Sequence, residues 1–217
     1  MRETTVAMKE IRDVVFDLGG VLVDWNPRHL FVRHLGLDPD EVEAFLASVC
    51  TTEWHLGLDA GRPFHEAIDS LVRRHPSEAH LIEVYLEKWQ HMFAGQFDET
   101  VAELRGYVDA GFRVHALTNY PGEQIRFLYE RFDFMRLFDT VVVSGLLGFA
   151  KPDRRIYEYL LAVIGAPTCL FVDDRPENVE AAAAAGIAGI HFDRQTGAAR
   201  LKEFREDLLS ERRHALP

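Results

Sequence analysis

Four short polar segments of this chain follow apolar runs of the kind that form buried strands. Their side chains are a carboxylate, a hydroxyl with an amide, an ammonium, and a pair of adjacent carboxylates. The residues are Asp17, Thr118 with Asn119, Lys151, and Asp173 with Asp174. A carboxylate can attack phosphorus or carbon and form a covalent intermediate, while positive groups offset the charge that develops. Together these groups have the chemistry of a nucleophilic site built on an aspartate.

The first polar segment begins at Asp17, directly after the apolar run Asp13–Phe16. Gly19 and Gly20 follow, and glycines let the chain turn sharply beside the carboxylate. Asp17 is therefore a candidate nucleophile. The alternative is an aspartate that caps a turn after a strand, since Asp and Asn are common in turns.

The next two segments offer groups that bind or neutralise an anion. Thr118 and Asn119 follow the run Arg113–Leu117, where a hydroxyl and an amide can bind one phosphoryl oxygen. Lys151 precedes Pro152, which restricts it to extended backbone and favours an ammonium that points inward. A Thr-Asn pair can equally begin a turn, and a lysine is more often solvated than buried.

The last segment places Asp173 and Asp174 after the apolar run Cys169–Val172. Two adjacent acids at the end of a buried strand are costly unless something pairs with them. Mg²⁺ suits such a pair because it favours one or two carboxylates with water and phosphate oxygens. Acids at a helix N-terminus are the alternative, which accounts for Asp174 and Glu177 but not for Asp173.

The elements that must position these groups alternate between strand and helix. Two further apolar runs span Thr140–Ser144, ahead of Lys151, and Ile187–Phe192. Amphipathic or alanine-rich segments separate most of the five runs. The expected helices are Asp98–Ala110, Pro121–Phe132, Arg154–Ile164 and Pro176–Ala185, with a final surface helix over Ala198–Pro217. Continuous apolar strands alternating with helices predict an α/β fold with a doubly wound, Rossmann-like parallel sheet.

The interval 24–96 breaks this alternation, because it has helical periodicity and no convincing strand. It follows the first strand at its carboxyl end, where α/β sheets bind ligands. We therefore expect an α/β core over residues 1–23 and 97–217, and an inserted α-helical cap over residues 24–96.

The composition limits the classes of binding partner and the cellular compartment that we expect for this protein. With 24 Lys and Arg against 35 Asp and Glu, the net charge is −11, which disfavours nucleic acid and anionic membranes as partners. Two cysteines cannot form a disulfide framework. The N-terminal residues lack the apolar stretch of a signal peptide, and no run is long enough to span a membrane. We expect a cytoplasmic protein, either a monomer or a homodimer.

The ordered set of Asp, Thr-Asn, Lys-Pro and Asp-Asp resembles the haloacid dehalogenase-like (HAD) hydrolase superfamily over nearly the whole chain. The helical interval is similar to the cap of that superfamily's first subfamily. The stretch from Phe16 to Pro27, FDLGGVLVDWNP, resembles the branch of bacterial sugar-1-phosphate phosphatases and of the N-terminal phosphatase domain of soluble epoxide hydrolases.

This resemblance implies a role for each matching residue. Asp17 would be the nucleophile and a Mg²⁺ ligand, Lys151 would balance charge, and Thr118 and Asn119 would hold the phosphoryl group. The remaining metal site would comprise Asp174 and the carbonyl of Gly19, supported by Asp173 and Asn178.

Gly19 is also where this sequence departs from the family, whose phosphatases usually carry a second aspartate at that position to protonate the leaving group. General acid–base catalysis contributes roughly 10²–10⁴-fold. We hypothesise that a side chain of the cap replaces that acid, and the candidates are His29, His55 and Asp59. Trp25 and His55 are expected to face the substrate, where an aromatic group beside polar ones suits a sugar or a small polar metabolite.

The predicted function is a Mg²⁺-dependent phosphatase that acts on a small phosphorylated metabolite, such as a sugar phosphate, through an aspartyl-phosphate. Two alternatives stay open. A metal-independent 2-haloacid dehalogenase also lacks an acid at the position of Gly19, although it would gain nothing from Asp173 with Asp174. A phosphate-binding protein of weak catalytic power would account for Gly19 but not for the other groups.

Overall fold

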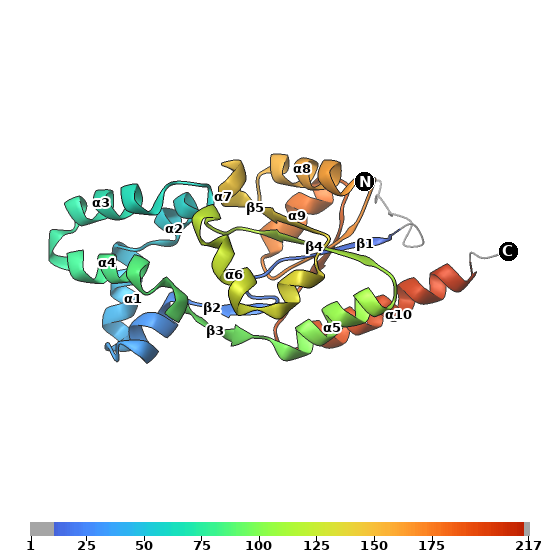
Figure 1. The fold of residues 1–217 in the computed structure, drawn as a ribbon, viewed down its shortest axis with the longest axis horizontal. Helices are drawn as coiled ribbons and strands as arrows, with labels where there is room; N and C mark the ends of the chain where they lie inside the picture. Colours follow the sequence, from blue (N-terminus) through green and yellow to red (C-terminus); the bar gives the residue numbers. More distant parts are fainter. Residues whose placement is uncertain (1–10, 215–217) are drawn as a thin grey trace.

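The computed structural model describes residues 11–214. The segment 1–10, on which the expectation about a signal peptide depends, and the last residues of the expected final helix, 215–217, lie outside the described residues. Figure 1 shows an elongated molecule with a helical segment at one end and a sheet flanked by helices at the other. Within residues 11–214, no helix is both long and apolar enough to cross a bilayer.

The main sheet is parallel and has five strands in the order β5-β4-β1-β6-β7. The strands are β1 (Asp13–Phe16), β4 (Arg113–Thr118), β5 (Thr140–Val143), β6 (Leu170–Asp173) and β7 (Ala188–His191). The chain fills one side of β1 and then the other, so the doubly wound α/β fold is confirmed. All four residues of β1 are buried, as the central strand of such a sheet requires.

Helices cover both faces of this sheet because successive residues of a strand point to opposite faces. Val14 and Phe16 belong to one apolar cluster and Val15 to another. The first cluster includes residues of α5 (Asp98–Asp109), α6 (Ile125–Arg131) and α10 (Gly197–His214). The second includes residues of α8 (Arg154–Ile164) and α9 (Pro176–Ala184). The carboxyl ends of the strands are left free to carry polar groups.

The residues between β2 (Val23–Trp25) and β3 (Phe93–Gln96) form the helical insert, residues 26–92. Its helices are α1 (Pro39–Ser48), α2 (Thr52–Asp59), α3 (Phe64–Arg74) and α4 (Ala79–Glu87), with a π-helical turn (His29–His34) and two 3₁₀ turns (Pro76–Glu78 and Trp89–Met92). The side chain of Asp38 caps α1 by accepting hydrogen bonds from the backbone N–H groups of Asp40 and Glu41. The insert shares one continuous apolar cluster with the sheet.

The expectation that residues 24–96 contain no strand is wrong. β2 and β3 pair as a two-stranded antiparallel sheet, with Val23 opposite Gln96 and Asp24 opposite Gly95. Both strands are too short for an alternating pattern to stand out, and Gly95 has no side chain to contribute to one. Their pairing with each other, rather than their composition, makes them strands. The chain thus enters and leaves the insert along adjacent strands.

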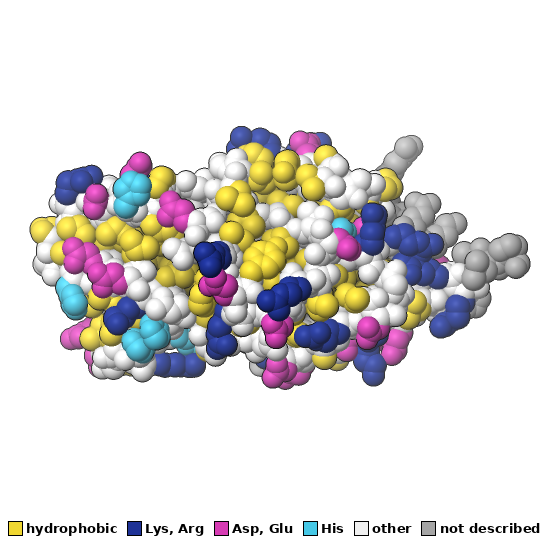
Figure 2. All heavy atoms as spheres, viewed as in Figure 1, with side chains coloured by type: hydrophobic (Ala, Val, Ile, Leu, Met, Phe, Trp, Pro, Cys, Tyr) yellow, Lys and Arg dark blue, Asp and Glu magenta, His cyan; other side chains and the backbone are white. Residues whose placement is uncertain are grey.

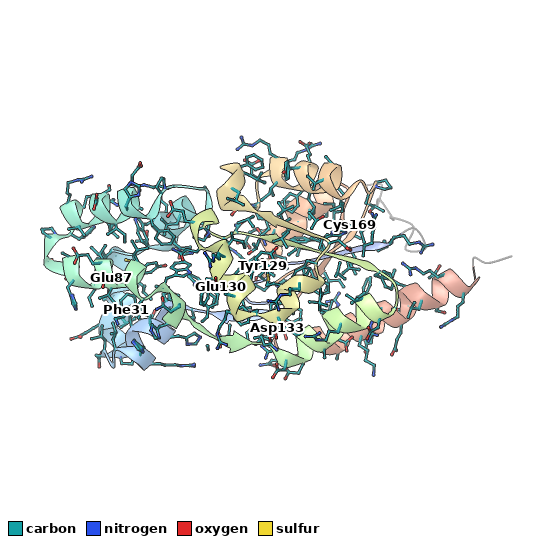
Figure 3. The ribbon with its side chains drawn as sticks, in the orientation of Figure 1. Phe31, Glu87, Tyr129, Glu130, Asp133 and Cys169 are labelled. Carbon is teal, nitrogen blue, oxygen red and sulfur yellow. The ribbon has the colours of Figure 1, made fainter. Side chains whose placement is uncertain are left out.

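The distribution of charged side chains on the surface and the state of the two cysteines agree with the composition. On the face seen in Figure 2, Lys and Arg are intermixed with Asp and Glu. Ion pairs between exposed side chains include Arg126–Glu130 and Arg136–Asp133. Figure 3 shows Glu130 and Asp133 on the body of the protein and Phe31 on the insert. Cys50 and Cys169 are both buried and free.

The insert docks on the sheet at one close contact between α2 and α7 (Ser144–Leu147). The Ser144 hydroxyl donates a 2.5 Å hydrogen bond to the carbonyl of Asp59, and it accepts one from the backbone N–H of Tyr120. A Cβ atom added at Gly61 would lie 2.8 Å from the carbonyl oxygen of Gly145. The two backbones approach too closely for a side chain, which fixes the end of α2 against the sheet.

The substitution Gly145→Ala should therefore destabilise the fold. Its Cβ would lie 2.4 Å from the backbone nitrogen of Gly122 and 2.7 Å from the carbonyl oxygen of Tyr120, so backbone must move. We expect a loss of about 2–4 kcal/mol in the free energy of unfolding, measured by urea denaturation. Gly57→Ala is the matched control, because its Cβ meets only Arg62 Cδ at 3.9 Å and alanine favours the helix by up to about 1 kcal/mol. Equal stability of the two variants would contradict the close packing of Gly145 against the backbone of Tyr120 and Gly122.

Candidate active site

A cavity of about 320 Å³ lies where the carboxyl edge of the main sheet meets the helical insert. It sits beside β1 and β6, where the strand order reverses and doubly wound folds bind ligands. Most of the residues singled out in the sequence line it. They are Asp17, Gly19, Trp25, His55, Asp59, Thr118, Asn119, Lys151, Asp174 and Asn178.

Lys151 lies at the base of the cavity and is 3% exposed. Its ammonium group is 2.9 Å from Asp17 Oδ1 and 2.6 Å from Asp173 Oδ2, and it donates a third hydrogen bond to the carbonyl of Leu117 at 3.0 Å. An ammonium has three N–H donors, so all three are used. Burial disfavours the charged lysine, but the two carboxylates outweigh that effect and raise its pKa.

Asp173 is fully buried and holds the base of the site together. Its Oδ2 faces Lys151, while its Oδ1 accepts hydrogen bonds of 2.9 Å from the backbone N–H of Arg175 and from the Asn178 amide. With its lone pairs occupied by these donors, Asp173 acts within the protein rather than toward the cavity. Asn178 therefore supports Asp173 directly, and its own Oδ1 has no hydrogen-bond partner among residues 11–214.

Negative charge exceeds positive charge at this base. Asp17, Asp173 and Asp174 each place a carboxylate oxygen within 4.8 Å of the others, against the single ammonium of Lys151. Burial raises the pKa of Asp17 to about 8, an effect that Lys151 opposes and that Asp173 and Asp174 reinforce. Burial and Asp173 also raise the pKa of Asp174. A divalent cation fits this donor set, because it would offset the excess charge with oxygen ligands that it prefers.

Gly19 and Gly20 differ in what they require. A Cβ at Gly20 would lie 2.3 Å from Asp174 Oδ2, and its φ of 73° is left-handed, so this position needs glycine. A Cβ at Gly19 would meet nothing within 4 Å in the described part of the chain. Sterics therefore explain Gly20 but do not explain why Gly19 lacks the usual acid.

Asn119 is engaged mainly with the backbone of Lys151. Its amide nitrogen donates to the Lys151 carbonyl at 2.9 Å, and its Oδ1 accepts from the Lys151 N–H at 2.8 Å. This paired contact places the lysine beneath the cavity. The sequence suggested a phosphate contact for Asn119, and nothing in its type or spacing indicated this second task.

Aromatic side chains form the wall contributed by the insert and its connecting strands. The ring of Trp25 stacks on His55, with centroids 4.7 Å apart, and Trp89 stacks on the same imidazole at 5.7 Å. The Tyr85 hydroxyl lies 2.8 Å from His55 Nδ1. The buried indole N–H of Trp25 has no hydrogen-bond partner within residues 11–214. Trp89, Tyr85 and Tyr120 were not singled out in the sequence, because aromatic residues at helical spacing are equally consistent with core packing.

The candidate acids are placed differently. His29 is not among the described lining residues: it is buried elsewhere, with Nε2 2.8 Å from Asp24 Oδ1. His55 and Asp59 both line the cavity, and His55 Nε2 lies 3.5 Å from Asp59 Oδ1. The structure thus leaves two of the three candidates in reach of a bound substrate.

A family model for haloacid dehalogenase-like hydrolases matches residues 11–186. This chain belongs to the haloacid dehalogenase-like hydrolases. The family and the hydrolase class predicted from the sequence are confirmed.

Two curated relatives of this HAD hydrolase are named as phosphatases. A sesquiterpene phosphatase of Aspergillus oryzae is 32% identical over 188 residues, covering 82% of this chain and 88% of the relative. A phosphatase of Mycobacterium tuberculosis is 30% identical over 196 residues, covering 85% and 88%.

Solved HAD structures share the fold at lower identity. A HAD family enzyme of Bacteroides thetaiotaomicron, in complex with magnesium and inorganic phosphate, aligns with a TM-score of 0.61 at 16% identity, covering 84% of this chain and 94% of that one. A dehalogenase with an intermediate bound aligns with a TM-score of 0.64 at 18% identity, covering 86% of each chain. Fold likeness alone therefore does not choose between the two chemistries.

Removing the ammonium of this HAD hydrolase should leave two buried carboxylates unpaired. We expect Lys151→Met to lower the free energy of unfolding by about 3–5 kcal/mol at pH 8 in EDTA. Loss of the lysine raises the pKa of Asp17 in the folded state further, because the ammonium opposes the effect of burial. A carboxyl group with a raised pKa destabilises the fold as pH rises through the interval between its unfolded and folded values. The loss should therefore be smaller at pH 5, as measured by denaturant titration at both pH values.

Lys202→Met, at an exposed position of α10, removes the same charge and is the control. It should change stability by less than about 0.5 kcal/mol at either pH. A Lys151→Met variant with a loss independent of pH would argue against the charge balance described above.

Proposed function

We propose that this HAD hydrolase is a Mg²⁺-dependent phosphatase that hydrolyses a small phosphate monoester through an aspartyl-phosphate on Asp17. The observation that carries the proposal is the cluster of Asp17, Asp173 and Asp174 around one buried ammonium at the base of a partly enclosed cavity. Two relatives of 30% identity or more are named as phosphatases, which supports this chemistry.

Asp17 and Asp174, with the carbonyl of Gly19, would hold the magnesium ion, and Asp173 and Asn178 would support them. When bound, the ion supplies positive charge that favours the ionised form of Asp17 and offsets the charge of a phosphoryl group. The Bacteroides thetaiotaomicron structure with magnesium and phosphate provides a precedent for this pairing in the fold.

Side chains around Asp17 hold the nucleophile and the phosphoryl group in position. Lys151 holds the carboxylate of Asp17 in place through a contact of 2.9 Å and adds positive charge beside it. One oxygen of Asp17 attacks phosphorus, the bond from phosphorus to the leaving oxygen breaks, and water later hydrolyses the acyl phosphate. Thr118 and Asn119, which line the cavity, would hold phosphoryl oxygens. The helical insert serves as the cap, over residues 24–96, that limits access of bulk water.

Two readings compete with this proposal. A metal-free dehalogenase would use Asp17 and Lys151, but it would have no use for the carboxylate of Asp174, which is neither hydrogen-bonded to Lys151 nor fully buried. A phosphate-binding protein would not need a nucleophile with a lysine beside it. Gly19 is compatible with all three readings, so the acid pair favours the phosphatase.

The lining of the cavity points to the organic part of the substrate. The exposed lining of the cavity is mainly apolar, and Trp25, Leu56, Trp89, Phe93 and Leu128 are among its residues. Such a lining favours an apolar alcohol over the sugar that the sequence suggested, because a sugar would bury several hydroxyl groups against side-chain carbon that cannot hydrogen-bond them. The relative from Aspergillus oryzae is named as a sesquiterpene phosphatase, in line with an apolar substrate.

Release of inorganic phosphate from 4-nitrophenyl phosphate tests the activity. We expect turnover with Mg²⁺ and loss of it in EDTA that added Mg²⁺ reverses. Asp17→Asn should reduce kcat/KM at least about a thousandfold, because it removes the nucleophile. Asp69→Asn, at an exposed position of α3, is the control and should match the wild type. Chloride release from 2-chloropropionate in EDTA, without phosphate release from any ester, would replace the proposal by the dehalogenase.

A comparison of two substrates tests the organic group. We expect kcat/KM for geranyl phosphate to exceed that for glucose 1-phosphate by at least about tenfold, which corresponds to about 1.4 kcal/mol of apolar burial. Trp25→Ala should raise KM for geranyl phosphate and change kcat less, because the ring contacts substrate away from the reacting atoms. A preference for the sugar phosphate would restore the expectation from the sequence.

A further inference from the structure

The proposed phosphatase chemistry, on which this inference rests, leaves one proton unaccounted for. An alcohol leaves phosphorus readily only when its oxygen is protonated, and Gly19 carries no acid. Lys151 cannot supply the proton, because its three N–H groups are bonded and its pKa is raised. The donor must be another group that faces the cavity.

Asp59 is the acid that the insert places in the cavity. It is 5% exposed and lines the same cavity as Asp17 and Lys151. Its Oδ1 is buried and has no hydrogen-bond partner within residues 11–214, although His55 Nε2 lies 3.5 Å away. A buried carboxyl oxygen without a partner is costly, so its persistence at the mouth of a reaction site points to a ligand that completes it.

The contact between the insert and the sheet fixes Asp59 relative to the base of the site. Ser144, at the end of β5, donates to the carbonyl of Asp59 itself at 2.5 Å. Two residues further on, Gly61 packs against the backbone of Gly145. Asp59 is therefore part of the insert, but its carboxyl group is held at the edge of the sheet.

The surroundings of Asp59 set its protonation. The charged and titratable groups around it are His55 on its own helix, Tyr85 on α4, Tyr120 after β4, and Lys151 and Arg175 at the sheet edge. Burial raises its pKa to about 7, against the opposing influence of Lys151 and Arg175. A carboxyl with such a pKa can both give and accept a proton near neutral pH.

His55 is the weaker candidate. Burial lowers its pKa to about 4, so the imidazole is neutral near pH 7. We assign its ring proton to Nε2, on the side of Asp59, with the Tyr85 hydroxyl donating to Nδ1 at 2.8 Å. A neutral imidazole that stacks against Trp25 and Trp89 lies beside Asp59 and is a poor acid itself.

We propose that Asp59 is the general acid and base of this enzyme, in place of the acid that Gly19 lacks. As Asp17 attacks phosphorus, the bond from phosphorus to the alcohol oxygen breaks and the Asp59 proton passes to that oxygen, releasing the alcohol. The Asp59 carboxylate then takes a proton from water as the water oxygen attacks phosphorus. The bond from phosphorus to Asp17 breaks, which yields inorganic phosphate and returns both aspartates to their starting states.

The test compares Asp59→Asn with the wild type on two substrates, n-octyl phosphate and 4-nitrophenyl phosphate. Octanol is a poor leaving group, so kcat/KM of Asp59→Asn for n-octyl phosphate should be about 10²–10⁴-fold below that of the wild type. Nitrophenolate leaves without a proton, so its kcat/KM should change less than about tenfold. Its kcat should fall further, with a burst of one nitrophenol per active site, because hydrolysis of the aspartyl-phosphate has lost its base.

Gly19→Asp in the Asp59→Asn background provides a rescue, since the described structure leaves room for a side chain at position 19. It should restore at least tenfold of the lost kcat/KM for octyl phosphate. In the wild type, kcat/KM for octyl phosphate should decline above pH 7 relative to that for 4-nitrophenyl phosphate, and Asp59→Asn should abolish this relative decline. Glu53→Gln, an exposed position of the same helix, is the control and should behave as the wild type.

The outcomes separate this inference from the proposed function. A wild type without phosphatase activity overturns both. An active wild type whose Asp59→Asn variant loses equal activity on both substrates, without a burst and without rescue, overturns only the role of Asp59. A folded variant with undiminished activity on octyl phosphate does the same, with thermal unfolding to confirm that the variant is native.

Discussion

The site depends on one buried ion cluster, in which the Lys151 ammonium lies between Asp17 and Asp173 at the carboxyl edge of the sheet. Each partner is positioned by a different element. Asp17 follows β1, Asp173 ends β6, and Lys151 is held by the amide of Asn119 after β4. Because a buried charge without its partner is so costly, the cluster requires these three strand ends to stay in register. The arrangement of β4, β1 and β6 therefore supplies the geometry of the site.

The sequence predicts the sheet and the base of the site well, since both follow from local patterns. Apolar runs mark the strands, and the polar residues that follow parallel strands must gather at one edge. The pair β2 and β3 could not be predicted, because strands of three and four residues owe their conformation to a partner more than sixty residues away. The task of Asn119 was missed for a similar reason: its hydrogen bonds join it to backbone far along the chain.

Asp59 shows where composition and structure give different information. In the sequence it is one of three polar residues in a helical interval, with nothing to rank it. Its position depends on Ser144, the last residue of an apolar run predicted as a strand, and on Gly145, which the sequence did not single out. The relevant signal was the set of small residues, Gly61 and Gly145, whose meaning appears only when the backbones are seen to touch. Chemistry from the insert and chemistry from the sheet thus meet through a contact made by residues without catalytic groups.

The two-stranded sheet that carries the chain into and out of the insert has a consequence for how such enzymes diverge. Gly19 bridges to Val23, and the N–H of Gly20 donates to the carbonyl of Val23, so the two-stranded sheet begins at the turn that follows Asp17. Because the strands that lead into and out of the insert are paired, the insert is a closed loop attached to the sheet at one place. A lineage can lengthen, shorten or exchange that loop while the ion cluster beneath it stays unchanged, and substrate range can evolve independently of the fold that supplies the nucleophile.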